Sequence, residues 1–411
     1  MADRSPQAGA HASPTAGRRF PLLAMRLAVI APGAFAEGAF AVALPWMLVQ
    51  AAQGAWWLGW ASALIVAAGI AGNLAAPAAA RRLGLRRMTV AGAVISLLCV
   101  LAAGGLWLAG HHLPAFAAAL CALVADGVSD VGFSARTPAL ARLCGQPLLR
   151  FSGDNWLWGI AGYALGSLAA GWATEAQGTT ALLLAVGASS LSVAAGLGWM
   201  LPRDSRAAAA LDGRPARALS QLLKPALAVA VSMMVWLSFV FGPLDNLLLP
   251  AHLAAHGRSA DLFGMMIAAG CVGLAAGLVV THAEGSHGVR GRTVLLVAGS
   301  AGVLLQAALV WQLPSAWMLV LGVALSSALI APLLPLLESA LLATAHAGSR
   351  TSVVAAAGVL VSGADMAGTA AFGWALEHHG TDSALAVCTL LTLPLMLLAI
   401  CSPRAWLLPR R

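Results

Sequence analysis

Several acidic residues of this sequence lie inside long apolar stretches, where a charge is costly. Glu37 is flanked by small residues in APGAFAEGAFAVALPW, and Asp365 lies in a second such stretch. Asp126 and Asp130, in VADGVSDVGF, are four residues apart, a spacing that places both carboxylates on one face of a helix. Two like charges this close favour sharing a proton. These four residues are therefore candidates for proton uptake and release.

Each of these carboxylates also has a structural explanation. An ionisable group at the centre of a membrane helix costs on the order of 2.5–3.5 kcal/mol, so it faces either a cavity or a polar partner. Glu37 would pair with a polar neighbour, although no basic residue lies at comparable depth. Asp126 and Asp130 would pair with Arg136 or with an arginine of another inner loop. The sequence favours a functional role for Glu37 and leaves both explanations open for the aspartates.

The composition places the chain in a membrane. Of its 411 residues, 60% are hydrophobic and 9% are charged, whereas soluble domains carry about 25% charged residues. A membrane-spanning helix needs about 20 apolar residues. Twelve such spans are predicted, at residues 24–49, 56–79, 88–110, 113–135, 154–174, 179–201, 225–249, 261–282, 292–312, 315–338, 352–375 and 383–403. We therefore expect an all-α integral membrane protein.

The basic residues predict its orientation. All but one of the 23 Lys and Arg residues fall on one side if both termini are cytoplasmic, and only Arg258 lies outside; basic residues avoid translocated loops. The predicted parts are a cytoplasmic tail (1–23), a six-helix bundle (24–201), a cytoplasmic linker (202–224), a second six-helix bundle (225–403) and a tail (404–411). The net charge of +8 is spread over short inner loops, which indicates the lipid bilayer, and not nucleic acid, as the partner.

The two predicted bundles repeat one another. GWATEAQGT from Gly171 recurs as GWALEHHGT from Gly373, 202 residues later, and GLRRMTV from Gly84 recurs as GVRGRTV 204 residues later. The same alignment places Gly166 on Gly368. We expect Gly166, Gly171, Gly368 and Gly373 to permit close helix packing. Two parallel six-span units, related by an axis along the membrane normal, would hold a central site between them.

The loop GNLAAPAAARRLGLRRM between the second and third predicted spans is similar to the pattern G-x-L-x-D-R-x-G-R-R. The residues that match are Gly72, Leu74, Arg82, Gly84, Arg86 and Arg87. With this loop, the duplication and twelve spans, the chain resembles the major facilitator superfamily over essentially its whole length. The resemblance implies that Gly72, Arg82, Gly84, Arg86 and Arg87 belong to a conformational-switch loop. Arg81 stands where the aspartate is expected, which weakens a charge-relay role.

A second loop, ARTPALARL from Ala135, is similar to the ARxxxLPxL stretch of an efflux branch that includes bacterial siderophore and macrolide exporters. The resemblance implies a secondary active transporter, not an enzyme, in the bacterial cytoplasmic (inner) membrane. The leading hypothesis is a proton-coupled exporter (antiporter) of a siderophore or drug-like compound, working as a monomer by alternating access. The alternative is an importer of a sugar, organic acid or other metabolite. A non-transporting sensor or assembly factor is a third class, and would be expected to carry an added soluble domain.

Polar residues near span ends and breaks are candidates for the wall of a substrate cavity. Asp245 and Asn246 follow a Gly-Pro break in FGPLDNLLLP, where substrate contact competes with a gate interaction. Tyr163, the only tyrosine, aligns with Asp365 in the repeat. Two interpretations of this pair are equally favoured: it binds substrate or carries protons, or it forms a hydrogen bond between helices.

The remaining cavity candidates are Trp46, Trp236 and Asn155. Both tryptophans lie deeper than the others, which are expected to anchor the spans at the membrane interface. Asp154 and Asn155 open the fifth predicted span, and Asp154 is expected to cap the N-terminus of that helix.

No cofactor or metal is predicted, because the sequence has no P-loop, no catalytic triad and no metal-like spacing of its cysteines. Six histidines gather on the predicted outer side, namely His111, His112, His252, His256, His378 and His379. Only His252 and His256 have helical ligand spacing. We expect solvated loop histidines here, in preference to a metal site or a pH sensor.

Overall fold

Helices make up almost all of the described chain. The computed structural model describes residues 22–51, 55–134, 136–145, 148–175, 179–201, 225–283, 289–312, 315–333 and 350–401. The predicted linker and nearly all of both tails lie outside these ranges. Within them the secondary structure is helical and no strand occurs, so the all-α prediction is confirmed.

The first half begins with one continuous rod, in which a π-helical turn, η1 (Arg26–Ile30), joins α1 (Leu22–Met25) to α2 (Ala31–Ala51). The other helices of this half are α3 (Ala55–Leu83), α4 (Leu85–Leu108), α5 (His112–Ser134), α6 (Thr137–Leu143), α7 (Leu148–Glu175) and α8 (Thr179–Met200).

The second half also begins with a rod that contains a π-helical turn. Here α10 (Pro225–Pro243), η3 (Leu244–Leu248) and α11 (Leu249–Ala255) follow one another. Pro243 cannot donate a backbone hydrogen bond to the preceding turn, so the helix changes its pattern at the predicted Gly-Pro break. The remaining helices are α12 (Ala260–Ala283), α13 (Val289–Gln312), α14 (Ala316–Ile330) and α16 (Arg350–Cys401).

Element α16 consists of two helices that meet at Gly380, whose φ of 76° interrupts the helical backbone and suits glycine because it has no Cβ. Eight described segments are long and apolar enough to cross a membrane, and one of them, Ala356–Pro394, runs through this turn. Two shorter apolar helices are Val297–Gln312 and Ala316–Ile330. Each of the twelve predicted spans overlaps a described helix, although some span ends, such as residues 109–110 and 331–332, lie in turns.

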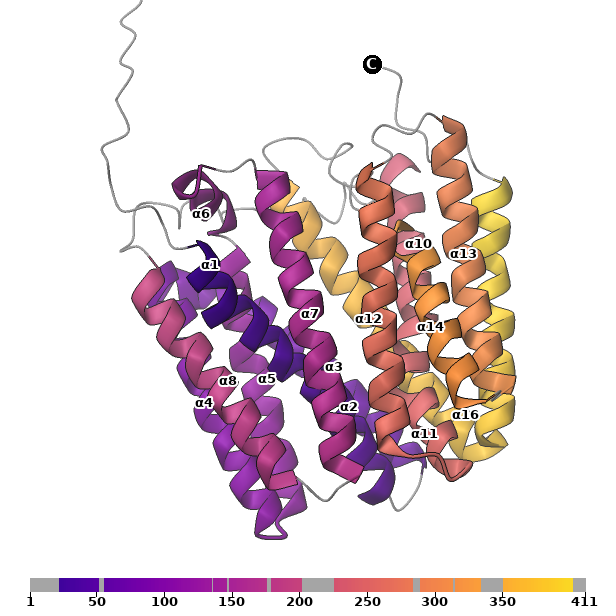
Figure 1. Ribbon diagram of the computed structural model, residues 1–411, viewed down its shortest axis with the longest axis horizontal. Helices are drawn as coiled ribbons and strands as arrows, with labels where there is room; N and C mark the ends of the chain where they lie inside the picture. The colour runs from indigo at the N-terminus through magenta and orange to yellow at the C-terminus, as the bar shows by residue number, and fades with distance from the viewer. Residues whose placement is uncertain are drawn as a thin grey trace, which may run out of the picture.

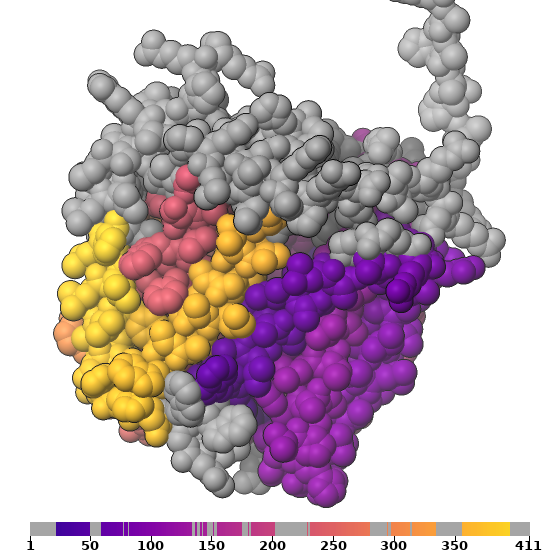
Figure 2. Space-filling model, turned by 180° about the vertical axis from the view of Figure 1, so that it is seen from behind, coloured from indigo at the N-terminus to yellow at the C-terminus, as the bar shows by residue number. Residues whose placement is uncertain are grey.

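The two halves pack their helices in the same pairs (Figure 1). Helix α2 packs on α7 as α10 packs on α16, and α4 packs on α5 as α13 packs on α14. The contacts between the halves are also duplicated, since α7 runs along α12 and α3 runs along α16. Seen from behind, the orange part of α16 lies directly against the violet surface of α3 (Figure 2).

Glycines allow these two helix pairs to approach closely. A Cβ atom placed on Gly264 of α12 would lie 3.1 Å from the Cα atom of Gly171 on α7. A Cβ atom placed on Gly59 of α3 would lie 2.6 Å from the Cα atom of Gly373 on α16. The glycines that open the repeated GWAxExxGT stretches therefore sit at the two crossings that join the halves.

Two further repeated glycines bring helices together within each half. A Cβ atom on Gly166 would collide with the carbonyl oxygen of Phe35 on α2, and one on Gly368 with the carbonyl oxygen of Phe239 on α10. Phe35 and Phe239 are 204 residues apart, so the same contact is built twice.

Candidate functional site

A cavity of about 440 Å³ runs through the interior of the first half. Its wall is formed by η1, α2, α3, α4, α5, α7 and α8, and Asn246 of η3 is the one described lining residue from the second half. The expected site between the halves is therefore not where this cavity lies. Where α2 meets η3, α11 and α12, the described residues between the halves are buried apolar side chains, including Trp46 of α2 stacked on Phe263 of α12 with ring centroids 6.2 Å apart.

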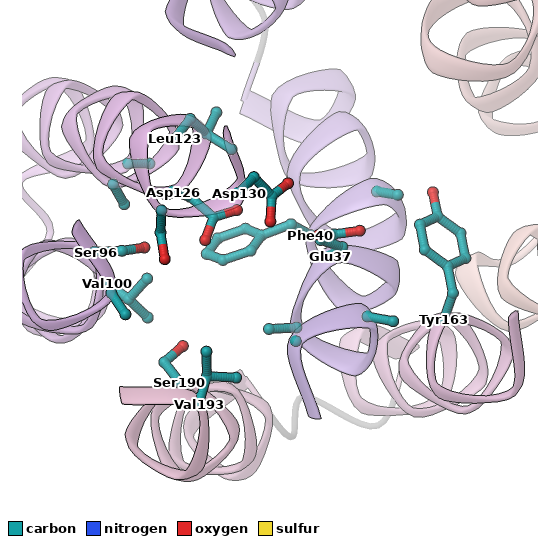
Figure 3. Close-up of a pocket in the computed structure, with 18 of the residues that line it drawn as sticks. Glu37, Phe40, Ser96, Val100, Leu123, Asp126, Asp130, Tyr163, Ser190 and Val193 are labelled. Atoms are coloured by element: carbon teal, nitrogen blue, oxygen red, sulfur yellow. The ribbon is translucent and has the colours of Figure 1, made fainter. Parts of the chain in front are cut away.

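Three carboxylates meet on the wall of this cavity (Figure 3). Glu37 extends from α2, while Asp126 and Asp130 lie one turn apart on α5. One carboxylate oxygen from each residue lies within 4.8 Å of the other two. All three residues were selected from the sequence as proton-coupling candidates, and Asp126 and Asp130 were expected on one helix face. The approach of Glu37 to this pair was not predicted, because it depends on how α2 and α5 are rotated about their axes.

The cavity has a strongly acidic character. Among the described residues that line it, none is Lys, Arg or His. At an effective dielectric constant of about 20, two unit charges 4.8 Å apart repel by about 3.5 kcal/mol. Three ionised carboxylates would therefore repel one another strongly, and binding of a proton or of a cationic molecule would relieve that repulsion.

Serine hydroxyls add neutral polar groups to the wall. Ser62, Ser96 and Ser190 all line the cavity. The Ser62 Oγ atom is buried and has no hydrogen-bond partner among the described residues, so its hydrogen-bonding capacity is unused. Ser129 also lines the cavity, but it donates to the carbonyl oxygen of Thr89 at 3.0 Å. These serines were not predicted, because a single serine within an apolar helix carries no specific signal.

One end of the cavity is apolar. A smaller pocket of about 70 Å³ shares Phe40, Leu44, Val100 and Ala119 with it and extends to Trp107. The site therefore combines an acidic, hydroxyl-bearing part with an apolar part, an arrangement that suits an amphiphilic molecule.

The carboxylates of the second half lie elsewhere. Asp245, in η3, accepts a hydrogen bond from Gln306 Nε2 at 2.9 Å, and Gln306 Oε1 accepts one from Ser326 at 3.0 Å. Asp365 accepts a hydrogen bond from Thr369 at 3.3 Å. Neither Asp245 nor Asp365 lines the cavity. Both take part in polar contacts between or within helices, and Gln306 was not predicted as a partner of Asp245.

Tyr163 lines the cavity from α7. A Cβ atom on Gly38 of α2 would collide with the backbone of Tyr163, and one on Gly242 of α10 would collide with the side chain of Asp365. Gly38 and Gly242 are 204 residues apart. Tyr163 and Asp365 therefore occupy equivalent places in the two halves, as the repeat predicts, but the described cavity contacts only Tyr163.

The predicted cap at Asp154 is wrong, because α7 begins at Leu148 and continues through this position. Arg26 Nη2 donates to Asp154 Oδ2 at 2.9 Å, and Arg26 Nε donates to Asn155 Oδ1 at 3.2 Å. These bonds join η1 to α7. Asn155, a predicted cavity residue, therefore holds two helices together and does not line the cavity.

The two deep tryptophans also pack within the protein. Trp46 is buried against Phe263. Trp236 donates its indole N–H to the carbonyl oxygen of Leu391 at 2.8 Å and stacks on Phe239. Neither tryptophan lines the described cavity.

The loop that resembles the superfamily pattern makes contacts within the first half. Gly72 packs α3 closely against the backbone of α5, and Gly84 has a φ of 77° at the turn between α3 and α4. Arg86 donates to the carbonyl oxygen of Gly198 on α8 at 2.7 Å, while Arg82 and Arg87 are exposed. A switching role for these residues stays a prediction.

The outer histidines are not all solvated. His252 is 1% exposed, because it lies on the face of α11 that packs into the protein. The prediction of solvated loop histidines is therefore wrong for this residue. His256, His378 and His379 are exposed, as are His111 and His112.

No protein-family model and no curated protein sequence matches this chain. Solved structures do match its fold. A crystal structure of a mutant of the nucleoside transporter NupG has a TM-score of 0.71 at 11% identity, and covers 92% of this chain and 99% of that one. A crystal structure of a D-xylose-proton symporter has a TM-score of 0.70 at 13% identity, with coverages of 92% and 97%.

A third match is the xylose transporter XylE from E. coli in a partially occluded, inward-open conformation, with a TM-score of 0.65, 12% identity, and coverage of 93% of this chain and 97% of that one. None of these three supports the efflux branch indicated by the ARTPALARL loop. At such low identities the likeness establishes the fold alone. This chain has the major facilitator fold.

Proposed function

We propose that this chain is a secondary active transporter that couples the movement of a small neutral or cationic molecule to protons by alternating access. The observation that carries the proposal is the meeting of Glu37, Asp126 and Asp130 on the wall of a cavity inside a major facilitator fold. Carboxylates serve proton coupling well, because a proton neutralises them and changes their interaction with a bound molecule.

The charge of the cavity wall narrows the class of molecules that the cavity can bind. The described cavity wall carries three carboxylates and no basic side chain, so an anion would be repelled. Its volume of about 440 Å³ lies within the usual range for small-molecule pockets. A neutral or cationic amphiphile fits both the acidic part and the apolar part, whereas an anionic chelator does not. This argues against an anionic siderophore as the cargo.

The coupling between substrate and proton depends on whether both occupy the acidic part of the cavity. A cationic substrate and a proton both relieve the repulsion among the three carboxylates, so they compete, and competition leads to exchange across the membrane. A neutral substrate does not compete with the proton, so both can bind and move together. The charge of the substrate therefore decides between antiport and symport.

Two directions of transport are supported, each by a different observation. The ARTPALARL loop favours export. The D-xylose-proton symporter among the structural neighbours favours proton-linked uptake. In either case we place the protein in the bacterial cytoplasmic membrane, functioning as a monomer with both termini inside.

The test uses the purified chain reconstituted in vesicles that contain the pH dye pyranine. D-xylose, uridine and the cationic dye ethidium serve as probes of the neutral and cationic classes, and an organic acid serves as the anionic control. Probe-dependent proton movement with a neutral or cationic probe, and none with the anion, supports the proposal. Uptake driven by sodium with no proton movement contradicts proton coupling. Accumulation in inverted vesicles indicates export, and accumulation in right-side-out vesicles indicates uptake.

A further inference from the structure

Two histidines and an aspartate come together at the end of α11. His252 and His256 are one turn apart on or just after this helix, and Asp382 follows the Gly380 turn between the two segments of α16. One ligand atom from each of the three lies within 4.8 Å of the other two. His252 Nδ1 lies 3.7 Å from Asp382 Oδ1. The cluster lies in the second half and shares no residue with the cavity.

His252 is buried, and its ring is poorly hydrogen-bonded. Its side chain is 1% exposed, and among the described residues neither ring nitrogen has a hydrogen-bond partner of normal geometry. A looser hydrogen bond with the backbone of Trp311 satisfies at most one of the two nitrogens. A buried polar group left without a partner costs about 1–3 kcal/mol. A metal ion bound to one ring nitrogen would remove that cost, and His256 and Asp382 are placed to complete its coordination.

The other two residues are already oriented and accessible. The ring nitrogen Nδ1 of His256 lies 2.9 Å from the carbonyl oxygen of His252. A carbonyl only accepts, so Nδ1 carries the proton and Nε2 presents its lone pair, which is the form that binds metals. The Asp382 side chain is 72% exposed. An ion can therefore arrive from solvent, and the site needs no opening of the helix bundle.

We propose that His252, His256 and Asp382 form a binding site for a divalent transition-metal ion of the zinc class. Two imidazoles and one carboxylate are ligands that zinc accepts, with water in the fourth position. Calcium and magnesium prefer oxygen ligands alone. Zinc binds nitrogen at about 2.0–2.1 Å in tetrahedral geometry, so the three ligand atoms would move closer together on binding. The bound ion would tie the end of α11 to the turn in α16.

The experiment measures zinc binding by the full-length chain, purified in detergent without a histidine tag. Competition with a zinc-sensitive dye gives affinity and stoichiometry, and the visible absorption of bound Co²⁺ reports tetrahedral coordination. The variants are Asp382→Asn and His256→Gln, both at exposed positions. The control is His378→Gln, because His378 Nδ1 makes the same local contact, 2.9 Å from the carbonyl oxygen of Trp374.

We expect one zinc per chain at micromolar affinity, a raised melting temperature with zinc, and a tetrahedral Co²⁺ spectrum. Asp382→Asn and His256→Gln should each weaken binding at least ten-fold, and His378→Gln should leave it unchanged. The proposal is overturned if the wild-type chain binds no zinc at micromolar concentrations. It is also overturned if the two site variants bind zinc as the wild type does, since the metal would then lie elsewhere.

Discussion

Replacement of Gly59 by alanine should push α3 and α16 apart where the two helices cross. Its Cβ atom would lie 2.6 Å from Gly373 Cα, and 3.4 Å from both Gly373 N and the carbonyl oxygen of Thr369. Carbon atoms pack at about 3.5–4.0 Å, so the two helices would have to separate by about 1 Å. All three opposing atoms belong to the backbone, and no side-chain rotation can relieve the clash.

Overpacking of this kind costs about 1–3 kcal/mol. We therefore expect Gly59→Ala to lower the melting temperature of the purified protein in detergent, followed by tryptophan fluorescence, and to slow transport. The matched control is Gly69→Ala on the same helix, where a Cβ atom would meet no atom of the described residues within 4 Å. Alanine there gains up to about 1 kcal/mol of helix propensity and should not destabilise the protein.

The duplication extends this prediction to the other crossing. Gly171→Ala brings a Cβ atom to within 2.8 Å of the carbonyl oxygen of Ala260 and 3.1 Å of Gly264 Cα, so it should behave as Gly59→Ala does. If both variants melt and transport as Gly69→Ala does, the close glycine contacts do not join the halves, and the reasoning from the repeat is refuted.

Three further predictions concern the cavity, the η1 turn and the orientation. Glu37→Gln should abolish accumulation driven by a proton gradient but preserve exchange of probe across the vesicle membrane, with Asp126→Asn behaving likewise. Arg26→Ala leaves the Asp154 carboxylate without its 2.9 Å partner and should destabilise the protein by about 1–2 kcal/mol, because hydrogen bonds to charged groups are the stronger ones. Burial raises the pKa of the Cys144 thiol, although the nearby Arg26 acts in the opposite direction. In a variant whose other cysteines are replaced, an impermeant maleimide should thus label Cys144 slowly at neutral pH, faster as the pH rises, and only from the cytoplasmic side.

Each of these has a contrary outcome. Unchanged gradient-driven accumulation in Glu37→Gln removes this residue from proton coupling. Wild-type stability of the Arg26→Lys variant would argue against the two-bond geometry, since lysine lacks the planar guanidinium group that donates both hydrogen bonds. Labelling of Cys144 from the outer side would invert the predicted topology.

The helical spans and the duplication were predictable because they depend on local properties of the chain. Apolar stretches of sufficient length give the spans, and GWATEAQGT with GWALEHHGT gives the repeat. The predicted start of α7 is wrong. The polar residues around Asp154 resemble a helix boundary, but they lie within a continuous helix, where Arg26 donates a hydrogen bond to the Asp154 carboxylate.

The site itself was only half predictable. A carboxylate within an apolar stretch is conspicuous because its burial is costly, so the sequence singles out Glu37, Asp126 and Asp130, and all three line the cavity. Their role in proton coupling stays a prediction. The approach of Glu37 to the two aspartates, the placement of the cavity inside one half, and the burial of His252 depend on the rotation and tilt of whole helices. A single sequence does not contain that information, since very similar apolar surfaces cover most faces of each helix.

The proposed mechanism requires Glu37, Asp126 and Asp130 to couple protons to transport. The most direct measurement is the number of protons moved per probe molecule, from pyranine fluorescence and probe uptake in the same vesicles, for the wild-type chain and for the variant in which all three residues are amides. We expect a fixed proton movement for the wild type and none for the variant, with exchange of probe retained. Equal proton movement by the two proteins would contradict it.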